Sequence, residues 1–145
     1  MRINVNSMDF KGSLINGPGI RSLLFLQGCS RHCPGCHNPS TWSPDKGESY
    51  DVEELARIIR AGCANRKLTI TGGEPLEQAE ALEELLDELE GFDICLYTSY
   101  GRDQIPRGIE SRLTYIKTGE YVNDKRTTTT PFIGSTNQKF IKIRG

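Results

Sequence analysis

Three cysteines stand within eight residues of this chain, at Cys29, Cys33 and Cys36. A structural zinc site normally closes with four protein ligands, and a cubane iron–sulfur cluster also takes four. A tight loop that offers three thiolates therefore leaves one coordination position for a ligand that is not protein. We expect a metal centre here whose open position is the place where chemistry occurs.

A second short segment carries groups that suit ligand binding. Gly72-Gly73-Glu74-Pro75 follows the strand-like residues 67–71. Because glycine has no Cβ atom, a ligand can approach the backbone of Gly72 and Gly73 closely, and an ammonium group would find carbonyl acceptors there. Such a segment alone is most often an ordinary strand-to-helix turn, but it gains weight beside an open metal position.

Predicted strands and helices alternate along the chain. Asp51 can cap a first helix with Glu54 in the reciprocal position, and Gly62 and Gly91 suit the C-terminal ends of the two helices. The second helix is predicted from about residue 76 to residue 90. Apolar runs predict strands at residues 22–27, 67–71, 93–98, 113–117 and 139–143.

This alternation favours a mostly parallel sheet with crossover helices. Ligand sites in such folds lie at the C-terminal ends of the strands. The loops Cys29–Cys36 and Gly72–Pro75 both begin at such ends. We therefore expect both loops at the edge of the sheet where such folds bind ligands.

Composition excludes several classes of function. The 145 residues carry 18 basic and 19 acidic side chains, so a general nucleic-acid-binding role has no electrostatic support. No apolar run approaches membrane-spanning length, and the first seven residues lack the apolar stretch of a secretion signal. We expect a cytoplasmic protein, where clustered cysteines more often hold metal than form disulfides.

These motifs together resemble the radical S-adenosylmethionine superfamily, and within it the small activating enzymes of anaerobic ribonucleoside-triphosphate reductase. The three-cysteine loop and the later Gly-Gly-Glu-Pro segment carry the likeness first. It continues through Asn16–Arg21, Leu26–Cys29, Cys36–Trp42, Thr71–Leu76 and Gly134–Gln138. These landmarks bracket nearly the whole chain in order.

The resemblance implies a mechanism that belongs to the cofactors, so we assign no separate catalytic residue. Cys29, Cys33 and Cys36 would ligate three irons of a [4Fe–4S] cluster, and S-adenosylmethionine would chelate the fourth through its amino and carboxylate groups. One electron from the cluster would cleave the sulfonium. The 5′-deoxyadenosyl radical would then remove a Cα hydrogen from a glycine of the partner reductase.

The resemblance also implies which residues bind S-adenosylmethionine. Gly72, Gly73 and Glu74 would receive its amino end. Gly35, Cys36 and His37 would lie along S-adenosylmethionine near the cluster, and His37 would border its adenine.

Chain length shapes the expected architecture. A closed eight-stranded barrel takes about 250 residues, so we expect residues 1–145 to form a single radical S-adenosylmethionine domain with an open or incomplete (β/α) barrel. The cluster loop would follow the first barrel strand. The open side would admit a loop of a glycyl-radical enzyme, the expected partner. Analogy alone implies a flavodoxin-like electron donor, and neither nucleic acid nor membrane is expected as a partner.

The likeness is weakest near the fourth predicted strand. Family members usually carry an Asp-Gly pair followed by a basic residue, whereas Thr118 and Glu120 stand at those places here. The residues Thr127–Thr130 are also unusual and predict an irregular loop. The alternative that the protein is an activase of another glycyl-radical enzyme therefore stays open.

Other readings of the cysteines also stay open. A small zinc-stabilised Cys3His binding module would use the three cysteines with His32 or His37. A c-type haem motif would leave Cys29 unexplained, and a CxxC thiol oxidoreductase would leave the Gly-Gly-Glu-Pro segment without a purpose.

Several further residues have two interpretations. Cys63 and Cys95 are more often buried apolar residues than ligands. Arg21 is either a solvated charge or a contact for carboxylate groups. Residues 97–100 either line a cofactor pocket or are ordinary sheet residues, and residues 137–138 either cap loops or face a partner.

Overall fold

The computed structural model describes residues 1–13, 17–29, 43, 46–119, 122, 125–128, 132–133 and 135–143. Four of the expected site residues lie outside this part of the chain, namely Cys33, Gly35, Cys36 and His37. The strands are β1 (Arg2–Ser13), β2 (Arg21–Leu26), β3 (Glu48–Asp51), β4 (Lys67–Gly72), β5 (Asp93–Tyr97), β6 (Tyr115–Thr118) and β7 (Lys139–Lys142). The helices are α1 (Val52–Gly62), η2 (Pro75–Gln78), α2 (Ala79–Asp87), η3 (Arg102–Gln104) and α3 (Arg107–Glu110).

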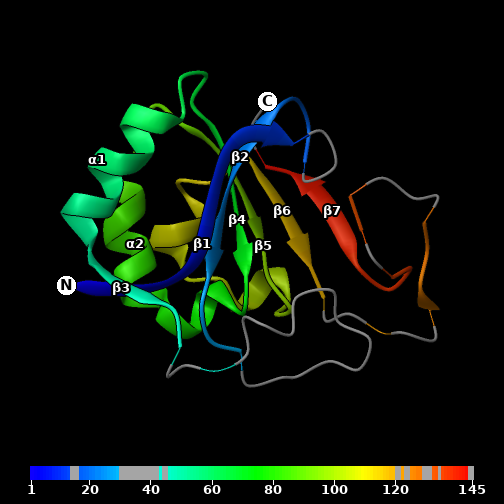
Figure 1. The fold of residues 1–145 in the computed structure, drawn as a ribbon. Coiled ribbons are helices and arrows are strands. Elements are labelled where there is room, and N and C mark those ends of the chain that lie inside the picture. The colour runs from blue at the N-terminus through cyan, green and yellow to red at the C-terminus, as the bar shows by residue number, and fades with distance from the viewer. Residues whose placement is uncertain are drawn as a thin grey trace.

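The strands form one sheet in the order β3-β1-β2-β4-β5-β6-β7 (Figure 1). The central strands β2, β4, β5 and β6 run parallel, whereas β1 pairs antiparallel with β2 and β3, and β7 pairs antiparallel with β6. The expectation of a mostly parallel sheet was wrong, because the sheet is mixed. β1 ends at Ser13 and β2 begins at Arg21, which leaves too short a connection for the crossover that a parallel pair needs.

The sheet is open, with β3 and β7 at its edges (Figure 1). The sequence prediction missed β1 and β3, which extend the sheet beyond β2. In β1 the alternation of Ile3 and Val5 with Asn4 and Asn6 is the signal, since both apolar side chains are buried and the intervening asparagines are not.

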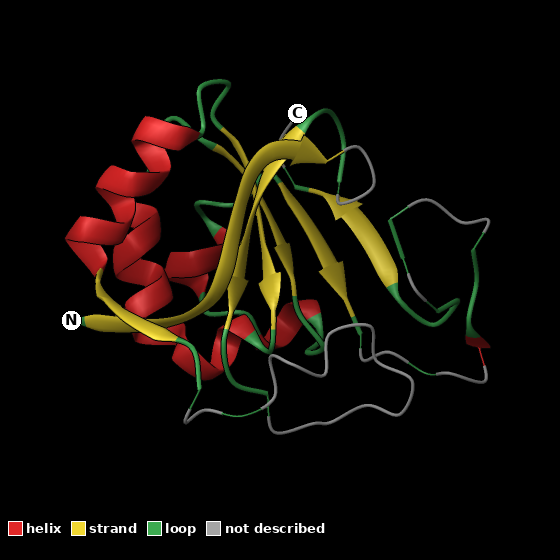
Figure 2. Ribbon diagram, viewed as in Figure 1, coloured by secondary structure: helices red, strands yellow, loops and turns green. Residues whose placement is uncertain are grey.

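One face of the sheet packs against the helices. Figure 2 shows the two longer helices, α1 and α2, to one side of the fanned strands. Alternate residues of the central strands enter this core, and helices α1 and α2 contribute their leucines and isoleucines. The sheet and helix members include Leu24, Leu26, Leu68, Ile70, Ile94, Leu96, Ile116, Leu55, Ile59, Leu82, Leu85 and Leu86.

Helix α1 begins where the sequence predicts it, but the expected capping hydrogen bond from the Asp51 side chain does not form. Asp51 is the N-cap residue and its side chain makes no capping hydrogen bond. Instead it belongs to β3, and the Val52 amide donates to the Met1 carbonyl at 3.0 Å. At the other end Gly62 is still helical, and Cys63 is the C-cap. A Cβ at Gly62 would lie 2.9 Å from the Phe10 ring, so close packing accounts for this glycine.

The second predicted helix is divided and shorter than expected. It opens as the 3₁₀ helix η2, because the Glu74 carboxylate accepts a hydrogen bond from the Leu76 amide at 2.9 Å. Helix α2 then ends at Asp87, three residues before the predicted end. Gly91 follows in the turn with a φ of 88°, in the left-handed region that glycine tolerates.

Arg21 joins the beginnings of the three parallel strands β2, β4 and β5 through its side chain. Its side chain is fully buried and donates to Thr69 Oγ1 at 2.9 Å and to the Leu68 carbonyl at 3.0 Å. It also pairs with the Asp93 carboxylate at 2.9 Å. Arg21 is therefore a contact for a carboxylate of its own chain. Arg21 is the first residue of β2, whereas the cysteine loop follows the last residue of β2. Arg21 therefore lies at the opposite end of the parallel strands from the start of that loop.

Replacing Arg21 with alanine is expected to lower the free energy of unfolding by about 3 kcal/mol, because several buried acceptors lose their donor. Urea denaturation followed by circular dichroism measures this change. Arg57 is exposed on α1, and its replacement by alanine should change the free energy by less than about 0.5 kcal/mol. Equal effects of the two substitutions would contradict the role given to Arg21.

Candidate functional site

The start of the cysteine loop and the Gly-Gly-Glu-Pro segment are hydrogen-bonded to each other. Strands β2 and β4 are parallel neighbours, and Leu26 is in register with Gly72. Beyond this pair the Gly73 amide donates to the Leu26 carbonyl at 2.9 Å, and the Glu74 amide donates to the Gly28 carbonyl at 2.8 Å. The expectation that both segments begin at one edge of the sheet is thus confirmed.

The two glycines are required by this close approach. Gly72 has a φ of 107°, and a Cβ there would lie 2.8 Å from the carbonyl carbon of Phe25. A Cβ on Gly73 would lie 2.7 Å from the carbonyl carbon of Gly28 and would overlap its oxygen. The missing Cβ atoms therefore admit the chain's own backbone, at the end of β2 for Gly72 and at Gly28 for Gly73. The sequence interpretation considered only the approach of a ligand.

Glu74 is buried at this edge, with 2% of its surface exposed. One carboxylate oxygen accepts from the Ser99 amide at 2.7 Å and the Ser99 hydroxyl at 2.6 Å. The other accepts from Thr98 Oγ1 at 2.7 Å and from the Leu76 amide at 2.9 Å. The Glu74 side chain therefore joins the ends of β4 and β5. Its carboxylate is held by the protein's own donors.

Further hydrogen bonds continue along the same edge to the C-terminal motif. The Gly119 amide, after β6, donates to the Tyr100 carbonyl at 3.3 Å. The Gln138 side chain donates to the Gly119 carbonyl at 3.0 Å and accepts from the Ser135 amide at 3.2 Å. Gln138 thus holds the loop after β6. We call these contacts, from Leu26 through Glu74 and Gly119 to Gln138, the edge network.

Gln27 connects the part of the chain before the cysteine-containing segment with Ser43, which follows that segment. It is 3% exposed, and its amide group donates to the Ser43 carbonyl at 2.7 Å and accepts from Asn6 at 2.8 Å. Gly47 packs against it with a φ of 89°, and a Cβ there would lie 2.8 Å from the Gln27 Cβ. Sequence analysis missed this role, because a glutamine just after a strand carries no signal of a partner 16 residues away.

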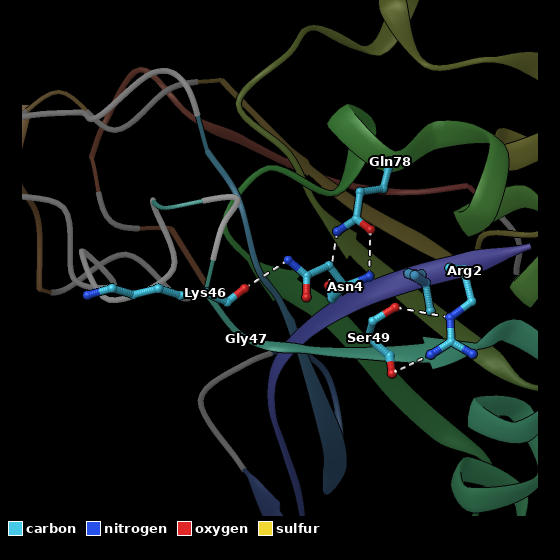
Figure 3. A pocket seen from close by; sticks show the side chains of 7 residues that line it. Arg2, Asn4, Lys46, Gly47, Ser49 and Gln78 are labelled. Atoms are coloured by element: carbon cyan, nitrogen blue, oxygen red, sulfur yellow. Dashed lines mark hydrogen bonds between the residues drawn. The ribbon is translucent and has the colours of Figure 1, made fainter.

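Gln78 supports the same region from η2 (Figure 3). Its side chain accepts from the Asn4 amide at 2.7 Å and donates to the Asn4 carbonyl at 3.0 Å. It also donates to the Gln27 carbonyl at 3.2 Å, while the Asn4 side chain donates to the Lys46 carbonyl at 2.9 Å. Asn4, Lys46 and Gln78 border an open polar pocket of about 350 Å³.

The described cysteines differ in their surroundings. Cys29 is half-buried and lies just beyond β2, at the edge network. Cys95 is buried in β5, and burial raises the pKa of its thiol to about 12. Cys63 is also buried, and its thiol donates to the Lys67 carbonyl at 3.3 Å. The burial expected for Cys63 and Cys95 is confirmed.

No three His, Cys, Asp or Glu side chains gather as a metal site within the described part of the chain. A centre at this edge would therefore combine Cys29 with residues beyond that part. The helices described here include none that is long and apolar enough to cross a membrane.

The chain is similar to known proteins over most of its length. Residues 15–141 match the family described as 4Fe-4S single cluster domain. The anaerobic ribonucleoside-triphosphate reductase-activating protein of Vibrio cholerae is 30% identical, over 86% of this chain and 89% of that protein. Its counterpart in Escherichia coli K12 is 28% identical, over 90% of this chain and 94% of that protein.

Two longer proteins are also similar. The pyruvate formate-lyase-activating enzyme of Staphylococcus aureus is 37% identical over 68% of this chain, which spans 42% of that enzyme. The crystal structure of QueE from Escherichia coli superposes with a TM-score of 0.58, covering 81% of this chain and 70% of QueE. At 24% identity, this second likeness concerns the fold alone.

The mixed sheet, the cysteine loop and the glycine segment bonded to it define an iron–sulfur enzyme of the radical S-adenosylmethionine type. The chain belongs to the 4Fe-4S single cluster domain family, in the group of the anaerobic ribonucleoside-triphosphate reductase-activating proteins. Its cofactors are accordingly a [4Fe–4S] cluster and S-adenosylmethionine.

Replacing Gly73 with alanine is expected to lower the free energy of unfolding by about 2 kcal/mol, because the new methyl group overlaps the Gly28 carbonyl. Urea denaturation measures the change. Gly101→Ala is the matched control, because a Cβ there meets only the flexible side chains of Asp103 and Gln104. An unchanged stability of Gly73→Ala would contradict the tight contact between the two loops.

Replacing Glu74 with glutamine is expected to cost about 3 kcal/mol of stability, because one end of the amide cannot accept the hydrogen bonds that a carboxylate oxygen accepts. Thermal and urea unfolding measure the loss. Glu80 is exposed at the start of α2, and Glu80→Gln should leave stability within about 0.5 kcal/mol. If both variants unfold alike, the Glu74 carboxylate does not hold the edge together.

Proposed function

We propose that this protein is a radical S-adenosylmethionine activase that generates a glycyl radical on an anaerobic ribonucleoside-triphosphate reductase. The pair of hydrogen bonds from Gly73 and Glu74 to Leu26 and Gly28 is the observation that carries the proposal. It sets the Gly-Gly-Glu-Pro segment against the start of the cysteine loop, so that a ligand bound by one lies beside a cluster bound by the other.

The residues present suit the cluster. Cys29, Cys33 and Cys36 are proposed as its three ligands, and Cys29 lies half-buried at the edge network. Three thiolates leave one iron for an exogenous ligand, as a chelated cofactor requires. Gln27 and its bond to Ser43 hold the two ends of the loop together, which keeps the ligand set close to the sheet.

The residues also suit S-adenosylmethionine. Gly72, Gly73 and Glu74 are proposed to receive its amino end through backbone carbonyls, since the amides of Gly73 and Glu74 already bond to the cysteine loop. Gly35, Cys36 and His37 are proposed to lie along the rest of it. When bound, the reduced cluster and this cofactor supply the radical chemistry, and the protein supplies binding, orientation and shelter from water.

The partner is proposed to be a polypeptide. Because the sheet is open, with β3 and β7 at its edges, we propose that it forms the wall of an incomplete (β/α) barrel, over a single domain of residues 1–145. The glycine-bearing loop of the reductase would enter on the open side. A flavodoxin-like electron donor and a cytoplasmic location complete the proposal.

A second glycyl-radical enzyme is an alternative target. The 37% identity to a pyruvate formate-lyase-activating enzyme favours this alternative, and so do Thr118 and Glu120 at the places of the family's Asp and base. Incubating the activase with each candidate enzyme separates the two targets, because only the true partner acquires a glycyl radical signal in electron paramagnetic resonance.

The cluster assignment predicts which cysteines matter. After anaerobic reconstitution and reduction, the protein should give a [4Fe–4S]⁺ electron paramagnetic resonance signal that changes when S-adenosylmethionine is added. Cys33→Ala should abolish the signal, whereas Cys63→Ala and Cys95→Ala should retain it, because both thiols are buried. A cluster that persists in Cys33→Ala, or stoichiometric zinc without any cluster, would overturn the proposal.

A further inference from the structure

A small groove lies at the opposite end of the parallel strands from the start of the cysteine loop. The end of α1, the end of β1 and the beginning of β2 lie together there (Figure 1). The groove has a volume of about 190 Å³, and its lining includes Phe10, Lys11, Ile20, Ala64 and Asn65. Pockets for cofactors and metabolites usually exceed about 300 Å³, so this groove suits a single side chain of another protein.

Ile20 supplies the apolar contact at this groove. Its side chain is 57% exposed, and Met1 is the only other large apolar side chain that is exposed among the described residues. A Cβ on Gly12 would lie 2.7 Å from Ile20 Cγ2, so Ile20 packs on the bare backbone of Gly12. The Asn65 side chain donates to the Ile20 carbonyl at 2.8 Å. Ile20 is therefore held in place, and a partner would immobilise it at little entropic cost.

Two positive charges flank the exposed isoleucine. Lys11 lines the groove and is exposed. Lys67 extends along Gly19, and its Nζ lies 2.9 Å from the place that a Cβ on Gly19 would take. Within the described part of the chain, neither ammonium group forms an ion pair with a carboxylate. Both charges are therefore available to a partner.

The acidic side chains near these lysines are engaged by other groups. Asp93 pairs with Arg21 at 2.9 Å, and Asp9 accepts a hydrogen bond from the Lys11 amide at 2.9 Å. None of the described residues that line the groove is acidic. The surface is thus apolar at its centre and positive at its rim, as protein interfaces commonly combine an apolar centre with a polar rim. The complementary segment carries an apolar side chain between acidic residues.

We propose that this surface, formed by Ile20, Asn65, Lys11 and Lys67, docks an acidic segment of a partner protein. An apolar side chain of that segment would enter the groove beside Ile20, and its carboxylates would pair with the two lysines. Cys29 follows the other end of β2, so a partner held here would not cover the start of the cysteine loop. The inference goes beyond the proposed function and does not require it.

The test is a nuclear magnetic resonance titration of the isotope-labelled full chain after anaerobic reconstitution. The probe is the peptide acetyl-Asp-Glu-Leu-Glu-Asp-amide, and the amide signals of Lys11, Ile20 and Asn65 should shift until they saturate. Ile20→Ala is expected to weaken the affinity about fivefold through the lost apolar contact. Lys67→Gln should weaken it about threefold, because one exposed ion pair is lost.

Lys46→Gln is the matched control, because Lys46 is exposed and borders a different pocket. It should leave the affinity unchanged, and the peptide acetyl-Lys-Lys-Leu-Lys-Lys-amide should cause no saturable shift. The proposal is overturned by the absence of saturable shifts at Ile20, by equal binding of the basic peptide, or by equal losses in Lys46→Gln and Lys67→Gln.

A second copy of the chain is the other occupant that the test must separate. Sedimentation equilibrium of the unsubstituted protein and of Ile20→Ser measures this. If the protein dimerises and Ile20→Ser makes it monomeric, a second copy covers the surface and the acidic partner is overturned. An unchanged sedimentation of Ile20→Ser, together with the selective peptide binding, supports the proposal. These readouts record neither the cluster nor a glycyl radical, so the proposed function stands or fails separately.

Discussion

Two backbone hydrogen bonds organise this molecule, from Gly73 to Leu26 and from Glu74 to Gly28. They form only because Gly72 and Gly73 lack Cβ atoms, which would collide with the end of β2 and with Gly28, respectively. Through them the end of one parallel strand fixes the start of the cysteine loop on the next. The start of the cluster loop is thus held by the sheet itself.

The edge network extends this arrangement across the parallel strands. The Glu74 carboxylate joins β4 to β5, and Gln138 holds the loop that follows β6. At the opposite end of the same strands, Arg21 joins the beginnings of β2, β4 and β5 through hydrogen bonds of its buried side chain. Polar side chains therefore secure both ends of the strands, while the apolar core covers one face.

The sequence predicted the central part of the fold because its signals are local. Apolar runs marked the parallel strands, and helical periodicity marked α1, whose face of Leu55 and Ile59 is buried as the pattern requires. The mixed character of the sheet was missed, because β1 and β3 were not recognised as strands and β7 gives no local sign of its direction. Strand direction depends on how the chain returns to the sheet, which a local pattern does not record.

The sequence by itself determined the chemistry. Three cysteines at spacings of four and three indicate an open metal centre, and Gly-Gly-Glu-Pro in order with them carries the resemblance to the family, since ligand types and spacings are properties of the chain. Only the tertiary structure decided what the other residues do. Glu74 bonds to Thr98 and Ser99, Gln27 bonds to Ser43, and Tyr97 lies beside Lys117. These contacts join residues distant in sequence, and their partners are set by strand order and register.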